Sequence, residues 1–92
     1  MEPENYHKQT YINDAVTYTT PQDIVSNCAQ ITFYNNAGTG GASIVILGIT
    51  LTPGQGIAFS GNDGELDVTK YYLTFTGAGN KSCAVIRKNY RL

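Results

Sequence analysis

The sequence has few of the residues that carry catalysis. It contains no tryptophan, two cysteines and a single histidine, His7, which lies in a polar N-terminal segment. Nucleophilic catalysis needs a histidine that a third group holds in place, and a lone histidine in a terminal segment has no such group at a recognisable spacing. No grouping of His, Cys, Asp and Glu suggests a reaction class. We therefore expect a protein that is not an enzyme.

Charge is also scarce. Charged residues make up 14% of the chain, against about 25% in an average domain, so part of the surface is expected to face protein. The alternative is a surface made polar by Gly, Thr and Asn. A net charge of -1 argues against nucleic-acid binding, which needs a basic face. No run approaches the roughly 20 apolar residues of a membrane span, and the acidic, polar opening does not resemble a secretory signal.

The cysteines, the alternating acidic residues and the glycine-rich segments are expected to have structural roles rather than to bind a metal or a cofactor. We expect Cys28 and Cys83 to be buried free thiols, because a chain without an export signal keeps its thiols reduced; a disulfide between them is the alternative. Asp63, Glu65 and Asp67 alternate like the start of a calcium loop, but the glycine and the closing glutamate of such a loop are missing. The glycine-rich segments precede strands, whereas a phosphate loop opens a helix. No metal or cofactor is predicted.

From Ile24 onward, strand-like and turn-like segments alternate. Ala29–Tyr34 has an apolar residue at every second position, which predicts a strand buried on one face. Pro53-Gly54 has the composition of a type II turn. Further strands are expected at 42–47, at 49–51 after a bend at Gly48, at 57–59, at 71–76 and at 82–90, with a hairpin turn at 77–80. The prediction is an all-β fold: a small antiparallel β-sandwich, jelly-roll or Ig-like, over residues 25–92.

Residues 1–24 differ from the rest of the chain. Their apolar side chains are few and widely spaced, so this segment cannot form a core of its own. We expect an extended N-terminal arm with one short strand near residues 15–19, where Tyr, Val and Thr favour a pleated surface. The arm holds more apolar residues than a disordered tail needs, and it is therefore predicted to dock on a protein surface.

Two stretches, Ser43–Leu47 and Cys83–Ile86, are apolar at successive positions. A strand covered on one face alternates apolar with polar residues, so a continuous apolar run needs cover on both faces. A chain of this size has a modest core, and the second cover is expected from the arm or from another subunit. The partners predicted are copies of the same chain. The predicted interface residues are Tyr11, Ile12, Val16, Tyr18, Ile44, Ile46, Tyr72, Arg87 and Tyr90.

Seven tyrosines are many for a chain of this length. Tyrosine buries its ring at protein interfaces while its hydroxyl stays hydrogen-bonded, and this is the use we favour. The alternative is a glycan-binding module for attachment to a host surface, with Tyr34 or Tyr72 as the stacking platform. Adjacent residues Tyr71 and Tyr72 point to opposite faces of a strand, so at most one of them serves such a site.

The segment Gly48–Glu65, together with Thr69-Lys70-Tyr71, resembles small β-rich structural proteins of tailed bacteriophages, in which an L-x-P-G turn joins two strands. The resemblance covers residues 28–92. It implies a non-enzymatic component of the virion, made in the host cytoplasm: a capsid decoration or auxiliary protein, a head fibre or a tail part. The implied partners are copies of the chain and other virion proteins, which the N-terminal arm contacts.

Overall fold

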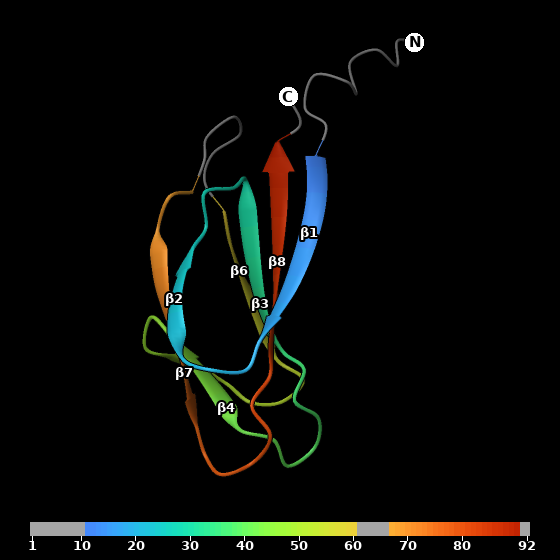
Figure 1. Cartoon of the computed structure of the whole chain (residues 1–92), viewed down its shortest axis with the longest axis vertical. Coiled ribbons are helices and arrows are strands. Elements are labelled where there is room, and N and C mark those ends of the chain that lie inside the picture. Colours follow the sequence, from blue (N-terminus) through green and yellow to red (C-terminus); the bar gives the residue numbers. More distant parts are fainter. Residues whose placement is uncertain (1–10, 61–66, 91–92) are drawn as a thin grey trace.

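The structure is a computed structural model that describes residues 11–60 and 67–90. These residues form eight β-strands and no helix, and thus no helix that could cross a membrane. The strands lie in two four-stranded sheets (Figure 1). Their bounds are β1 Tyr11–Tyr18, β2 Gln22–Val25, β3 Gln30–Asn35, β4 Ser43–Ile46, β5 Ile49–Leu51, β6 Gly56–Ser60, β7 Lys70–Thr76 and β8 Cys83–Tyr90.

One sheet has the strand order β1-β8-β3-β6 and the other β2-β7-β4-β5, and all neighbouring strands are antiparallel. The chain crosses between the sheets at every connection except the one between β4 and β5. This is the strand order of a jelly roll, the eight-stranded form of the β-sandwich built from two Greek keys. The predicted antiparallel β-sandwich is thus confirmed, and the order is that of the jelly roll.

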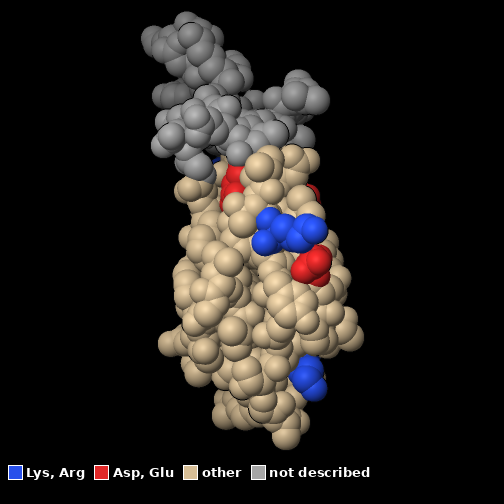
Figure 2. All heavy atoms as spheres, turned by 90° about the vertical axis from the view of Figure 1, so that its left-hand side faces the viewer, with Lys and Arg blue, Asp and Glu red and all other residues tan. Residues whose placement is uncertain are grey.

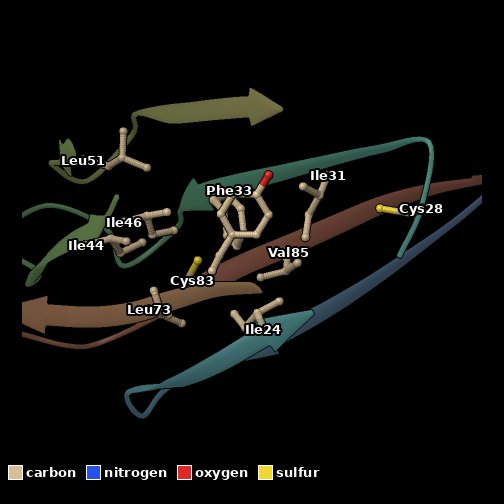
Figure 3. Packing of buried hydrophobic residues seen from close by; sticks show 11 residues of the cluster. Ile24, Cys28, Ile31, Phe33, Ile44, Ile46, Leu51, Leu73, Cys83 and Val85 are labelled. Atoms are coloured by element: carbon tan, nitrogen blue, oxygen red, sulfur yellow. The ribbon is translucent and has the colours of Figure 1, made fainter. Parts of the chain in front are cut away.

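Alternation along the strands places the core between the two sheets. On β3, Ile31, Phe33 and Asn35 are fully buried, whereas Tyr34 between them is exposed. The Phe33 ring meets Tyr71 of the other sheet edge-on, with ring centroids 5.2 Å apart. Figure 3 shows the apolar side chains converging from both sheets. The cluster consists of Ile24, Cys28, Ile31, Phe33, Ile44, Ile46, Leu51, Tyr71, Leu73, Cys83 and Val85.

The two continuous apolar stretches are covered largely by the chain itself. On β4, Ile44 and Ile46 are fully buried in the core, which corrects their assignment to an interface. Val45 faces outward and is half-buried, because threonines of β5 and β7 flank it in the sheet. The outward residue of the second stretch, Ile86, is 39% exposed. On β4, side chains of the neighbouring strands therefore provide the cover of the outer face that was expected from a second subunit.

The predicted turn at 52–55 is confirmed. The Gln55 N–H donates to the Thr52 carbonyl at 3.0 Å, and Gly54 has the positive φ of 93° that a type II turn requires. The bend expected at Gly48 is sharper than predicted. Leu47 and Gly48 have φ of 51° and 75°, the two positive values of a two-residue type I′ turn, so β4 and β5 form a hairpin.

The hairpin expected at 77–80 was a wrong prediction. β7 pairs with β2 and β4, and β8 pairs with β1 and β3, so this segment passes from one sheet to the other. Gly79 in this segment allows two loops to approach each other closely. A Cβ on Gly79 would overlap the carbonyl oxygen of Gly40, and the Ala42 N–H donates to the Asn80 carbonyl at 2.8 Å.

The expected arm is, from residue 11 onward, part of the sandwich. Tyr11–Tyr18 forms β1 and pairs along its whole length with β8, and the boundary expected between residues 24 and 25 lies inside β2. Backbone pairing explains why so few apolar residues suffice there: the main chain of β8, rather than a hydrophobic stripe, holds the segment. Residues 1–10 lie outside the described part of the chain.

Candidate assembly edge and loop-end pocket

β1 is the longest edge strand of the sandwich. Its eight residues pair with β8 in a register that runs from Tyr11 opposite Tyr90 to Tyr18 opposite Cys83. Within residues 11–60 and 67–90, no strand pairs with its other side. An open edge of this length presents a row of N–H and C=O groups that can accept a further strand, and proteins usually shorten, charge or cover such edges. β1 is therefore a candidate surface for association.

The charge on β1 is engaged within the chain. Asp14 is the one charged residue of the strand. Its Oδ1 lies 4.0 Å from the Arg87 guanidinium, and its Oδ2 accepts a hydrogen bond from Asn89 at 3.0 Å. Arg87 also donates to the Val25 carbonyl at 3.0 Å, and its side chain is only 18% exposed. Arg87, predicted to contact a partner, thus ties β8 to the strands beside and opposite it.

The remaining predicted interface residues lie on two surfaces. Val16 on β1 is 43% exposed, and Tyr18 is partly buried against the core. Tyr72 on β7 is 58% exposed on the outer face of the other sheet. The side of the molecule formed by β2 and β7 carries few charged side chains (Figure 2). Tyr11, Ile12 and Tyr90 lie in the paired strands, but their side chains fall outside the described structure.

A pocket of about 310 Å³ lies at the end of the sandwich where β3 leads into the glycine-rich loop. It is lined by Tyr34, Asn35, Asn36, Gly38, Thr39, Pro53 and Gly54. Gly56 of the neighbouring strand β6 pairs with Tyr34, and a Cβ on Gly56 would lie 3.0 Å from the Phe33 carbonyl oxygen and 3.2 Å from Tyr34 Cδ1. Glycine at this position therefore leaves room for both the Phe33 carbonyl and the side chain of Tyr34, a residue that is 40% exposed.

Asn35 fixes the loops around this pocket. Its Nδ2 donates to the carbonyls of Ala42 and Leu51, both at 2.9 Å, and its Oδ1 accepts from the Ala37 N–H at 3.1 Å. Its backbone N–H donates to Gln55, and its carbonyl accepts from Gly54. In the sequence, Asn35 directly follows the alternating pattern of Ala29–Tyr34 and marks only the end of that strand. Its position two residues after Phe33 also places it on the inward face, where a polar residue must be fully hydrogen-bonded, and this was the available signal of its role.

A second hollow is lined by Asp67 and Tyr71, among other residues. Asp67 accepts a hydrogen bond from the Tyr71 hydroxyl at 2.6 Å and from the Thr69 N–H at 3.0 Å. Partial burial opposes ionisation, but these hydrogen bonds outweigh it and lower the pKa of Asp67. Burial and the bond to Asp67 raise the pKa of Tyr71 to about 12. Asp67 and Tyr71 are bonded to each other, and the Tyr71 ring packs beside Phe59. This arrangement favours a structural role for the pair.

Nothing in the described residues assembles a metal or thiol centre. They contain no group of three or more His, Cys, Asp or Glu side chains that could hold a metal ion, and His7, Asp63 and Glu65 lie outside them. Cys28 and Cys83 are buried free thiols. Cys83 lies opposite Asn35 at the end of β3, whereas Cys28 lies just before the start of β3. Five residues of strand span about 17 Å, so the two thiols are too far apart to form a disulfide. Burial raises the pKa of Cys83 to about 11, so the thiol stays protonated at neutral pH.

The fold and these surfaces define the class: an eight-stranded jelly-roll β-sandwich with an open edge strand and a loop-end pocket. Comparison with family models, curated proteins and solved structures finds no match to the chain. Inference about function therefore rests on the residues of this chain.

Proposed function

We propose that the chain is a non-enzymatic structural subunit that assembles with copies of itself through the free edge of β1. The observation that supports this is the eight-residue edge strand, whose single charge is already engaged by Arg87 and Asn89 of the same chain. A second copy of β1 satisfies the open backbone groups by adding its strand to the sheet. In line with the resemblance to phage structural proteins, the proposed setting is the virion, where other virion proteins are further partners.

The pattern of side chains selects one register for a two-fold pair of β1 strands. Ala15 lies opposite the exposed Ile86, and Val16 lies opposite the buried Val85, so odd residues of β1 face outward and even residues face the core. Residues directly opposite each other in an antiparallel pair share a face. The sheets of the two copies therefore keep their core faces on the same side only when the two-fold axis passes through a residue of β1, so that this residue lies opposite its own copy.

Two such registers pair the greatest length of strand. An axis at Asp14 pairs residues 11–17 of both chains, but it sets two carboxylates directly opposite each other, which is destabilising. An axis at Ala15 pairs residues 12–18 and places Asp14 opposite Val16 of the second copy. Axes at Asn13 or Val16 pair fewer residues. The proposed assembly therefore has its two-fold axis at Ala15 and joins two four-stranded sheets into one of eight strands.

Thiol cross-linking tests the register. In the Ala15→Cys variant, a short bifunctional thiol reagent is expected to yield a covalent dimer, because the two introduced thiols meet at the axis. Ala58→Cys is the matched control, since Ala58 is also exposed but lies on β6, the opposite edge of the same sheet. The native cysteines are buried in the folded chain, which shields them from the reagent. Equal cross-linking of both variants, or of neither, contradicts the register.

Light scattering of the unmodified chain tests self-assembly itself, with a concentration-dependent dimer or larger oligomer as the expected result. A monomer at every concentration refutes it. The virion setting has its own test, mass spectrometry of purified phage particles, in which many copies per particle are expected. A chain that is expressed during infection but missing from particles refutes that setting.

A further inference from the structure

The loop-end pocket has a composition that the assembly edge does not explain. None of its lining residues is charged: they are a tyrosine, two asparagines, a threonine, a proline and two glycines. The hydroxyls of Tyr34 and Thr39 make no hydrogen bond with other residues of the described structure. A concave surface that combines an aromatic ring with neutral polar side chains suits a small polar ligand, because the ring supplies apolar contact and the polar groups supply hydrogen bonds. The lack of charge argues against phosphate, carboxylate and cationic ligands.

The pocket is also held in one shape before any ligand binds. The fully buried Asn35 connects its two walls, because it bonds to Ala37 and Ala42 on the glycine-rich loop and to Leu51 beside the Pro53-Gly54 turn. On the rim, Asn36 Oδ1 accepts a hydrogen bond from Ser82 at 2.6 Å, which orients the side chain and leaves its amide hydrogens for a ligand. Rigid walls reduce the entropy that binding costs.

We propose that this pocket binds a neutral carbohydrate. The Tyr34 ring, which lines the pocket and lies next to Gly56 of β6, packs against the apolar C–H face of a sugar ring. The Thr39 hydroxyl and the Asn36 amide hydrogen-bond the sugar hydroxyls, which are both donors and acceptors. Tyr72 plays no part, because it lies on the outer face of the other sheet. The site is two strands away from β1, so binding and assembly are compatible.

The test is a titration of the full chain, labelled with ¹⁵N, with a panel of neutral methyl glycosides of hexoses and N-acetylhexosamines at millimolar concentration. At least one glycoside is expected to shift the amide signals of Gly38, Thr39 and Gly54 in a saturable way. Tyr34→Ala is expected to weaken that binding at least tenfold, whereas the matched variant Tyr72→Ala leaves it unchanged. Thr39→Val, which keeps the shape of the side chain, is expected to weaken it several-fold.

Three results overturn the proposal. The first is a panel in which no glycoside shifts the three amides of the unmodified chain. The second is binding that Tyr34→Ala leaves intact. The third is an equal loss in the Tyr34→Ala and Tyr72→Ala variants. Circular dichroism establishes that each variant is folded, and Thr39→Val gives an independent reading if Tyr34→Ala unfolds the chain: unchanged affinity in that variant also counts against the site.

Discussion

Asn35 offers the sharpest test of how this small domain is held together, and Asn35→Asp is the change that tests it. The substitution keeps the shape of the side chain but replaces the Nδ2 donor with an oxygen. Both bonds to the carbonyls of Ala42 and Leu51, at 2.9 Å, are lost, and a carboxylate then faces two carbonyl oxygens in a fully buried position. The bond that Oδ1 accepts from Ala37 can remain.

The expected cost follows from these contacts. Two buried hydrogen bonds contribute about 1–1.5 kcal/mol each, and unpaired buried carbonyls and a desolvated charge add to the loss, so we expect about 3–5 kcal/mol. Domains of this size are stable by about 5–15 kcal/mol. Urea denaturation at neutral pH is the assay, and a midpoint lowered by about 1–5 M is the expected result.

The adjacent residue provides the control. Asn36→Asp makes the same chemical change at an exposed position and retains the oxygen that accepts from Ser82, so a change below about 0.5 kcal/mol is expected. Measurements at acidic pH provide a second test, because the carboxyl group introduced by Asn35→Asp regains one hydrogen-bond donor when it is protonated. The stability gap between the two variants should therefore narrow as the pH falls. A gap under about 1 kcal/mol at neutral pH, or one that is constant with pH, refutes the role given to Asn35.

Two further predictions concern the loop contact and the buried titratable groups. Gly79→Ala is expected to destabilise the fold by about 1–3 kcal/mol, because the added Cβ would overlap the Gly40 carbonyl oxygen. Thermal unfolding measures this loss, and Ala78→Ser, at the exposed neighbouring position, is the control and should leave the stability unchanged. Folding stability is expected to fall in alkali, since the pKa values of Cys83 and Tyr71 are raised to about 11 and about 12 in the folded chain. Both groups are held in their neutral forms by the folded chain, so the free energy of unfolding is unaffected below about pH 9 and falls as the pH rises from about 9 to 12. Denaturant titrations across this range should show the loss, and it should be smaller in Tyr71→Phe than in the unmodified chain; an equal loss in both contradicts the assignment to Tyr71.

Local features of the fold could be predicted from the sequence because they depend on neighbouring residues. The alternation of Ile31 and Phe33 with polar residues marks a half-buried strand, and Pro53-Gly54 specifies its turn by the dihedral angles that proline and glycine favour. The buried free thiols at Cys28 and Cys83 also followed from chemistry, since burial suits a small apolar side chain.

The pairing partners of the strands could not be predicted in the same way. A glycine-rich segment between two strand patterns predicts a hairpin, yet Gly79 allows two loops to touch while its flanking strands join different sheets. Likewise, β1 has the weak apolar pattern of a free arm, but backbone bonds to β8 hold it. Both outcomes depend on contacts distant in sequence, and the Tyr34 pocket depends on them as well, because its two walls come from loops on either side of β4 and β5.

The scarcity of charge and the open edge of β1 together create a requirement for specificity. A long edge strand with little charge can pair with many extended segments, and such pairing leads to aggregation unless one partner and one register are favoured. Asp14 supplies that preference. Arg87 and Asn89 hold its carboxylate in place, so it cannot easily turn away from a second Asp14, and the axis at Ala15 is the remaining long register. Asp14→Asn should therefore relax the register and increase aggregation, which turbidity measures, and a variant as soluble as the unmodified chain would contradict this role.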